Sequence, residues 1–451
     1  MTNVSIDLSK SIGKIKPMHS TNNGPQYKFA ADQRITNLYS FRDAGIPYAR
    51  NHDAAFNATY GGEHIVDVNF IFRDPDADPY LPESYDFTLT DEYLKVIELS
   101  GAKVFYRLGS KIEHWSKKYN TLPPKDFNKW AVICEHIIKH YCYGWADGYH
   151  MDIEYWEIWN EPDLDPDDST HKRCWGGTAK EFYKLFRITL EHLKTKFPKL
   201  KIGGPAIAHF GGGEWTRGLL ESLGDIKPDF FSWHVYSPTV EKVRRLIREV
   251  RALLDEYGLT ECESILNEWN YVRGWEGDDW FYSLRQMQGY KGAAFVAAVM
   301  LMAEGEPLDN LMYYDARRGA MNGLFDSDFI SVLRPGYYSF YAFNQLYRIG
   351  NEVEATLDGA DDVYAKAASE GGESAVMLTY YNDDEALTEA RDVKVTFKNA
   401  NFDSKMKLEY YLHCEGNDYK LMREEIFTAS EFSAYITMPK NSTYVLKLTK
   451  A

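Results

Sequence analysis

The chain has 451 residues, of which 44% are hydrophobic and 15% are aromatic, and it carries a formal net charge of −16 at pH 7. This length predicts one big domain with an appendage, or two to three smaller domains, around a large core. The negative charge argues against nucleic acid and anionic membranes as partners, because both would repel the chain at long range, and it favours a neutral ligand.

Five cysteines are spread along the chain without a C-x-x-C pair. This pattern is typical of reduced thiols in a cytosolic protein, with disulfides as the less favoured alternative. The segment MTNVSIDLSKS has no basic region followed by an apolar run, and no stretch reaches the roughly 18 apolar residues of a membrane span. We therefore expect a cytoplasmic protein without a secretion signal or a membrane anchor.

Short β-type runs alternate with helical patterns through the first three quarters of the chain. The eight runs are 14–20, 46–51, 102–108, 154–160, 200–206, 230–237, 263–270 and 310–316. The clearest helical patterns, with apolar residues every three or four positions, are 28–44, 90–100, 125–143, 178–197, 239–257 and 280–304. Eight alternating βα units predict a (β/α)8 TIM barrel. The alternative, a doubly wound open sheet, requires a glycine fingerprint at the first helix, which this sequence lacks.

Beyond residue 350 the pattern changes from helical to alternating strands separated by turn residues. This change predicts an accessory antiparallel β-sandwich domain over residues 351–451. Residues 1–12 also alternate, so we expect them to complete that domain with one more strand. The predicted catalytic barrel then covers residues 13–350.

Two glutamates stand out among the polar residues at the predicted strand ends, where barrel enzymes carry their reactive groups. Glu161 ends the fourth strand, and the following Pro162 should bias its backbone to an extended conformation. Glu268 ends the seventh strand, which faces the fourth across the mouth of an eight-stranded barrel. Glu157 lies earlier on the fourth strand, and we expect it to pair with a base such as Arg107 if it faces the interior.

Such a carboxyl pair is what glycoside hydrolysis requires. One carboxylic acid protonates the leaving oxygen, while the other carboxylate attacks the anomeric carbon or activates water. The acid needs a raised pKa while its partner stays ionised. A separation of roughly 5 Å would indicate retention of configuration, and one of roughly 6.5–9.5 Å inversion.

The motif EIWNEPD, with Trp159-Asn160-Glu161-Pro162 closing the fourth strand, and Glu268 ending the seventh resemble the clan of retaining glycoside hydrolases with (β/α)8 barrels. The layout of residues 14–350, the terminal β-domain and the segment LRPGYYSFYAFNQL (333–346) are most similar to glycoside hydrolase family 39. That family contains β-xylosidases and α-L-iduronidases.

The resemblance assigns roles to individual residues. Glu161 matches the general acid/base, Glu268 the nucleophile, and Asn160 the residue that hydrogen-bonds the sugar 2-hydroxyl. His234 and Tyr236 resemble the sixth-strand pair, in which the tyrosine orients the nucleophile. Arg50 resembles the arginine that keeps the nucleophile ionised by its charge.

Other residues on the predicted catalytic face complete the candidate substrate-binding set. His52 and Trp269 follow the second and seventh strands, and Tyr314 lies at the eighth. The segment 313–326, YYDARRGAMNGLFD, departs from the family pattern of a tryptophan followed by an acidic loop. Five tryptophans in loops after the third, fourth and seventh strands could wall a closed pocket, which favours exo-action: Trp115, Trp175, Trp269, Trp275 and Trp280.

We therefore predict a retaining exo-glycosidase that acts on β-linked sugars, most favourably a β-D-xylosidase acting on xylo-oligosaccharide ends, without a cofactor. The alternatives are a β-glucosidase, β-galactosidase, arabinofuranosidase or endo-hydrolase with the same chemistry, or a non-catalytic carbohydrate-binding barrel. His136 and His140 have the spacing of metal ligands, but the intervening residues lack the glutamate of HExxH, so we predict no metal site. The oligomeric state stays open, with a homo-oligomer among the options.

Overall fold

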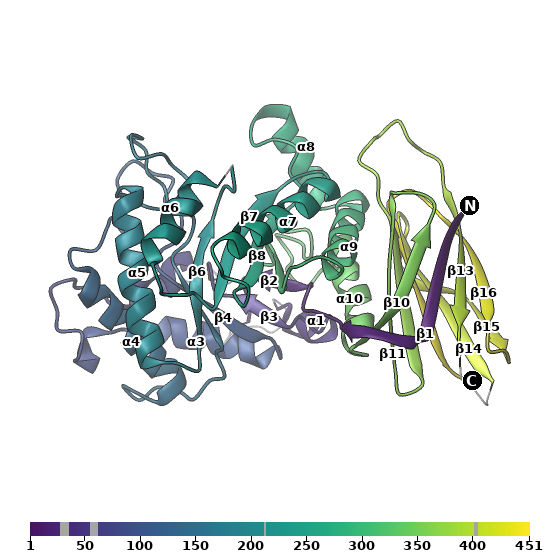
Figure 1. Cartoon of the computed structure of the whole chain (residues 1–451), viewed down its shortest axis with the longest axis horizontal. Helices are drawn as coiled ribbons and strands as arrows, with labels where there is room; N and C mark the ends of the chain where they lie inside the picture. Colours follow the sequence, from purple (N-terminus) through teal and green to yellow (C-terminus); the bar gives the residue numbers. More distant parts are fainter. Residues whose placement is uncertain (28–35, 55–61, 212, 401–404) are drawn as a thin grey trace.

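The computed structural model describes residues 1–27, 36–54, 62–211, 213–400 and 405–451. Figure 1 shows two bodies side by side: a barrel with surrounding helices, and a strongly curled sheet that contains both ends of the chain. Helices α9 and α10 lie between the two bodies.

Eight strands form a closed barrel in the order β2 to β9, and every neighbouring pair is parallel. The strands are β2 (Ser20–Asn22), β3 (Tyr48–Arg50), β4 (Lys103–Leu108), β5 (Tyr155–Ile158), β6 (Lys201–Ile207), β7 (Phe230–Tyr236), β8 (Glu263–Asn270) and β9 (Asn310–Tyr313). The predicted (β/α)8 TIM barrel is therefore confirmed. Because the strands are parallel, their carboxyl ends meet at one mouth of the barrel.

The helices of the described chain follow these strands. They are α1 (Leu38–Asp43), α2 (Val68–Ile71), α3 (Thr88–Leu99), α4 (Phe127–Tyr143), α5 (Ala179–Lys196), α6 (Glu214–Leu223), α7 (Val240–Glu256), α8 (Gly277–Met287), α9 (Tyr290–Glu304) and α10 (Pro335–Tyr347), with 3₁₀ turns η1 (Gly62–Val66) and η2 (Pro82–Ser84). Thr178 caps α5 with a capping box to Glu181, and Asp126 caps α4, so both helices start where their sequences signal it.

Three sequence expectations require correction. The first barrel strand was expected at residues 14–20 but is the short β2, because Lys14 ends β1 of the accessory sheet and residues 15–19 form an irregular connection before β2. The expected helix 280–304 is two helices, since Gly289 has an extended backbone between α8 and α9. Of the expected helix 28–44, α1 covers the last part, and residues 28–35 lie outside the described residues.

The accessory domain is one nine-stranded sheet in the order β15-β14-β17-β12-β11-β10-β1-β13-β16. Its strands are β1 (Thr2–Lys14), β10 (Asn351–Asp358), β11 (Val363–Glu370), β12 (Glu373–Tyr380), β13 (Arg391–Lys398), β14 (Met406–Cys414), β15 (Asn417–Phe427), β16 (Phe432–Met438) and β17 (Ser442–Lys450). All pairs are antiparallel except β1 with β13, which is parallel. The curled sheet encloses its own apolar core, with Val4 and Ile6 of the N-terminal strand among its residues.

The interface between the two bodies is built on α9, which is apolar around its whole circumference. Every residue from Lys291 to Glu304 is buried, and the helix contacts α7, α8, α10 and strands β11, β12 and β17. A helix without a polar face must be covered on all sides, so α9 requires the accessory sheet as its second cover. The sheet is therefore part of the support of the barrel.

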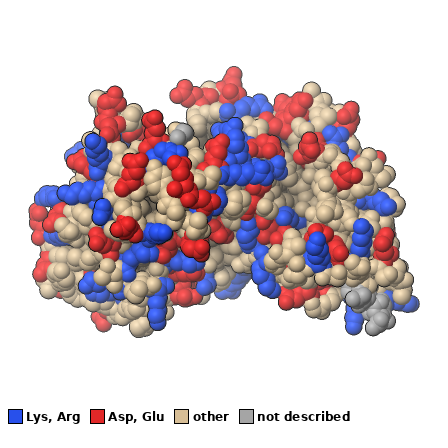
Figure 2. All heavy atoms as spheres, in the orientation of Figure 1, with Lys and Arg blue, Asp and Glu red and all other residues tan. Residues whose placement is uncertain are grey.

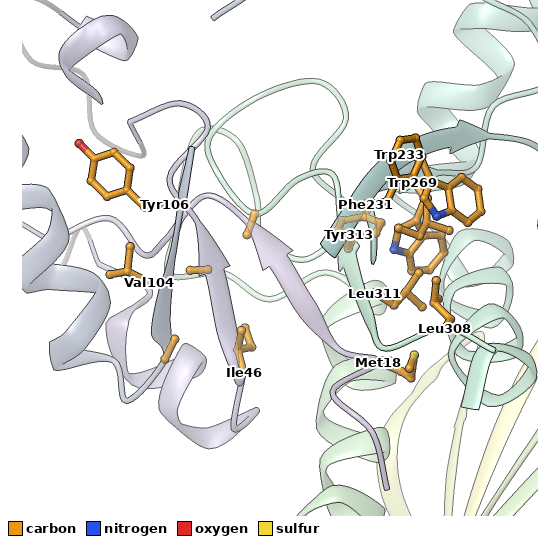
Figure 3. Close-up of a cluster of buried hydrophobic side chains, with 14 of the residues drawn as sticks. Met18, Ile46, Val104, Tyr106, Phe231, Trp233, Trp269, Leu308, Leu311 and Tyr313 are labelled. Atoms are coloured by element: carbon orange, nitrogen blue, oxygen red, sulfur yellow. The ribbon is translucent and has the colours of Figure 1, made fainter. Parts of the chain in front are cut away.

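The layer between the barrel strands and the helices is densely aromatic. Figure 3 shows Trp233 and Trp269 pointing away from the barrel axis, together with Phe231, Leu311 and Tyr313. Alternation along each strand sends the neighbouring side chains, such as His234 beside Trp233, to the inside. This arrangement leaves the polar residues at the strand ends facing the mouth.

The surface carries both signs of charge. On the face in Figure 2, lysine and arginine are interspersed with aspartate and glutamate. Among the described residues, no helix has the length and apolar character needed to cross a lipid bilayer.

Candidate active site

Glu161 and Glu268 are both brought to the barrel mouth by irregular backbone. Glu161 follows β5 with a φ of +47°, and its amide donates to the carbonyl of Ala206 at 2.9 Å. This left-handed conformation corrects the extended one expected from Pro162, because the hydrogen bond to β6 outweighs the local preference. In β8 the pairing register shifts between Leu266 and Trp269, and this bulge allows both Asn267 and Glu268 to face the interior.

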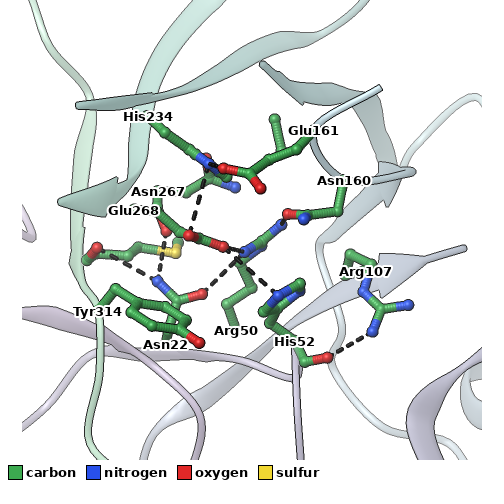
Figure 4. A network of polar contacts seen from close by, with 12 residues as sticks. Asn22, Arg50, His52, Arg107, Asn160, Glu161, His234, Asn267, Glu268 and Tyr314 are labelled. Carbon is green, nitrogen blue, oxygen red and sulfur yellow. Dashed lines mark hydrogen bonds and ion pairs between the residues drawn. The ribbon is translucent and has the colours of Figure 1, made fainter. Parts of the chain in front are cut away.

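The two glutamates lie face to face around His234. Three atoms lie within 4.8 Å of one another: one carboxylate oxygen of Glu161, one carboxylate oxygen of Glu268 and a ring nitrogen of His234. His234 Nδ1 is 2.9 Å from Glu161 Oε1 and 3.6 Å from Glu268 Oε2. Figure 4 shows both carboxylates directed to the same space at the centre of the mouth. A gap near 5 Å fits a sugar's anomeric centre between a nucleophile and an acid.

Arg50 holds the base of this site in a buried network. Its guanidinium donates to Glu157 at 2.7 Å, Glu268 at 2.8 Å, Asn160 at 2.7 Å and Asn22 at 2.9 Å. Glu157 thus pairs with Arg50. The expected partner Arg107 instead binds Asp67 at 2.8 Å, which corrects that expectation. The guanidinium is fully buried and each of its nitrogens has a hydrogen-bond partner. Arg50 therefore places a rigid positive charge next to Glu268.

The two acids differ in their direct contacts. Burial raises the pKa of both Glu161 and Glu268. The Arg50 charge and the Tyr236 hydroxyl, which donates to Glu268 Oε2 at 2.9 Å, directly contact Glu268 and favour its ionised form. Glu161 instead contacts His234, whose pKa burial lowers to about 4, so the imidazole is neutral near pH 7. Glu268 therefore has two direct contacts that favour its ionised form, whereas the imidazole that contacts Glu161 is neutral.

The other candidate residues fall into two groups. His52 lies at the mouth, with Nε2 3.7 Å from Glu268 Oε1, and the Tyr314 ring lies 6.3 Å from the His52 ring. Trp269 is not at the mouth: its ring packs against Phe295 of α9 and against Tyr313. Its expected role in substrate binding is therefore wrong, because the strand points this side chain outward into the apolar layer.

Trp175 is likewise buried against Trp159 and Phe182. Trp115 and Trp275, by contrast, are 54% and 55% exposed. Trp175 and Trp269, two of the five tryptophans expected to line the pocket, are thus core residues.

A charged group near Tyr314 was missed as a unit by sequence reasoning. Asp53, one residue beyond His52, lies 3.3 Å from the Lys111 ammonium and 3.2 Å from Arg317, and Arg317 also binds Asp315 at 2.7 Å. These four side chains come from three different loops and share no motif. The one sequence feature that could have predicted this group is that each of the three loops follows a barrel strand.

Two groups of described residues contain residue types that can bind metal ions: His136 and His140, which have the sequence spacing of metal ligands, and a cluster at the barrel mouth. His140 stacks on Phe87 with ring centroids 3.6 Å apart and lies 3.0 Å from Asp91, so its position in α4 is explained by packing. Within the described ranges, Glu161, His234 and Glu268 are the one group of three donors close enough to share an ion. Each of these three already has a hydrogen-bond partner in the site, which fits acid–base chemistry without requiring an ion.

A closed parallel barrel with two facing glutamates at its mouth, one of them paired with a buried arginine, defines the class of (β/α)8-barrel glycoside hydrolases. The sequence matches "Glycosyl hydrolases family 39" over residues 4–300. The chain belongs to this family.

Known proteins resemble the chain to different extents. A "Beta-xylosidase" of Geobacillus stearothermophilus is 28% identical over 184 residues, which are 37% of this chain and about a third (34%) of that protein. A glucosidase from Croceicoccus marinus superposes over 100% of this chain and 99% of its own, with a TM-score of 0.81 and 20% identity. A monomeric beta-xylosidase from Caulobacter crescentus superposes over 99% of both chains, with a TM-score of 0.74 and 16% identity. At these identities the two structures show a shared fold.

Tyr236→Phe should lower kcat while the fold is retained. The substitution removes one hydrogen bond to the charged Glu268, and such bonds contribute about 1.5–3 kcal/mol, or roughly 10- to 150-fold in rate. Steady-state kinetics measure the loss, with Tyr435→Phe on β16 as a control that should behave like the wild type. Unchanged kcat in Tyr236→Phe would show that the hydroxyl does not contribute to turnover through Glu268.

Proposed function

We propose that this protein is a retaining exo-glycosidase that hydrolyses β-linked glycosides and that its preferred sugar is β-D-xylose. The observation that carries the mechanism is the spacing of the two glutamates, with carboxylate oxygens within 4.8 Å on either side of His234. That spacing leaves room for an anomeric carbon but not for an additional water, as inversion would require. The recessed position of both acids, with 14% and 6% of their side chains exposed, favours chain ends as substrates.

In the first step, a Glu268 oxygen attacks the anomeric carbon as the glycosidic C–O bond breaks, and Glu161 donates its proton to the departing oxygen. The now ionised Glu161 then removes a proton from water. The resulting hydroxide attacks the anomeric carbon, Glu268 leaves as a carboxylate, and Glu161 is protonated again. Asn160, positioned by Arg50, would bind the sugar 2-hydroxyl, an interaction that strengthens as positive charge develops on the ring.

The names of the related proteins support xylose without deciding the substrate. The curated relative and one of the similar structures are called beta-xylosidases, whereas the Croceicoccus structure is called a glucosidase. A β-glucosidase with the same mechanism is therefore the second candidate.

The test is a panel of nitrophenyl xylosides, glucosides, galactosides and arabinosides, followed by ¹H NMR of the first product formed from the best substrate. We expect the β-xyloside to react fastest and to release β-xylose first. Faster release from another glycoside would show that xylose is not the preferred sugar and would leave the retaining mechanism standing. The α-anomer as first product would overturn retention.

A further inference from the structure

An exposed aromatic surface lies directly beside the reacting pair. The Tyr236 hydroxyl contacts Glu268, and the Tyr236 ring meets Trp275 edge to face, with centroids 4.9 Å apart. Trp275 in turn stacks on Trp280 with centroids 5.3 Å apart and planes at 29°. The contacts Glu268–Tyr236–Trp275–Trp280 therefore run without interruption from the nucleophile to the surface.

Trp275 keeps 55% of its surface exposed although a second tryptophan and a tyrosine are packed against it. A large aromatic side chain that is held in place and still open to solvent is a common feature of binding surfaces. The pair lies on the β8–α8 connection and the first turn of α8, the helix that projects at the top of Figure 1. A flat ring at this place is suited to the apolar face of a sugar or aryl group.

The segment that carries these tryptophans is fixed by the accessory domain. Asp383, in the β12–β13 loop, accepts a hydrogen bond from Tyr271 at 2.7 Å and forms an ion pair with the buried Lys291 at 2.7 Å. Arg273 lies 3.8 Å from the same carboxylate, and its guanidinium covers the ring of Tyr282 at 3.8 Å. The start of the segment 271–282 is thus tied to Asp383, and its far end is tied to Glu385 of the same loop, which accepts a hydrogen bond from the Tyr282 hydroxyl.

We infer that Trp275, supported by Trp280, forms the binding surface for the leaving group of the glycoside, and that Asp383 of the accessory domain is its positioning residue. The ligand class is the ring attached to the scissile oxygen, either the next sugar of an oligosaccharide or an aryl aglycone. This inference rests on the proposed function and extends it to the part of the substrate beyond the cleaved bond.

The test compares two substrates with the same sugar, xylobiose and β-xylosyl fluoride, of which the fluoride has no leaving-group ring. The quantity measured is the ratio of kcat/KM for xylobiose to that for the fluoride in the same preparation. This ratio is independent of the fraction of enzyme that is folded. We expect it to fall about tenfold in Trp275→Ala, in line with the loss of one aromatic contact, and to fall by a smaller factor in Asp383→Asn.

Phe281→Ala is the matched control. Phe281 lies on the same helix, is 59% exposed and forms no ring pair with any other residue in the described part of the chain. Its ratio should equal that of the wild type. An unchanged ratio in Trp275→Ala would overturn the binding surface, and an unchanged ratio in Asp383→Asn alone would overturn the positioning role. If the wild type cleaves neither substrate, the proposed function itself fails.

Discussion

Glu268→Ala should abolish turnover, with kcat at least about 10⁴-fold below the wild type, because the reaction loses the atom that attacks the anomeric carbon. The truncated side chain leaves a space beside Arg50 and Tyr236 that a small anion can enter. Added azide should therefore restore turnover of a substrate with an activated leaving group and yield the α-glycosyl azide, identifiable by NMR.

The control for this variant is Glu263→Ala. Glu263 begins the same strand at the opposite end of the barrel, where it pairs with Lys201. Its loss should leave turnover intact. Turnover close to the wild type in Glu268→Ala would eliminate Glu268 as the nucleophile.

Glu161→Ala should produce a loss that depends on the leaving group. Xylobiose needs protonation of its departing oxygen, so kcat/KM should fall about 10²- to 10⁴-fold. A dinitrophenyl xyloside, whose leaving group is stable as an anion, should lose far less in its first step. Azide should now give the β-glycosyl azide, since it replaces water on the face that Glu161 serves. Equal losses for both substrates would contradict the role of general acid.

The same variant should change the pH profile. Burial raises the pKa of Glu161, and this residue donates only while protonated, so wild-type activity should be present below that raised pKa and be lost as pH rises through it. In Glu161→Ala the alkaline decline should disappear from kcat/KM. Glu154→Ala, just before the same strand at its far end, provides the control and should keep the decline.

The barrel could be predicted from the sequence because its signal is repeated eight times. Each buried parallel strand is a short apolar run between helices of ordinary length, and errors at single boundaries, such as the first strand, do not alter the count. The nine-stranded order of the accessory sheet could not be predicted, since the parallel pairing of β1 with β13 joins segments almost 400 residues apart that carry no pairing signal.

In the candidate site, too, the sequence predicts some residue positions and not others. The sequence places Glu161 and Glu268 at the barrel mouth because each ends a recognisable strand. Trp269 was misplaced because it was treated as a loop residue, although it lies within β8 next to the inward-facing Glu268, so that alternation sends it outward. The bulge adds what alternation could not predict, since it turns Asn267 inward together with Glu268. A bulge depends on the pairing of β8 with both neighbours, which the sequence of β8 alone does not reveal.

The partners of Arg50 illustrate a further limit. Glu157 was expected to pair with a buried base. It does, but the described part of the chain offers two buried arginines, Arg50 and Arg107. Which of them lies opposite Glu157 depends on strand stagger around the closed barrel. That stagger places Arg50 between Glu157 and Glu268, and Arg107 beside Asp67.

Covalent trapping with a 2-deoxy-2-fluoro-β-xyloside tests the facing-glutamate mechanism most directly. The fluorine slows both steps, and a good leaving group keeps the first one fast enough for the glycosyl-enzyme to accumulate. Mass spectrometry of the digested protein should find one fluorosugar per chain, attached to the carboxylate of Glu268. A label on any other residue, or none on an enzyme that turns over the parent xyloside, would contradict the mechanism.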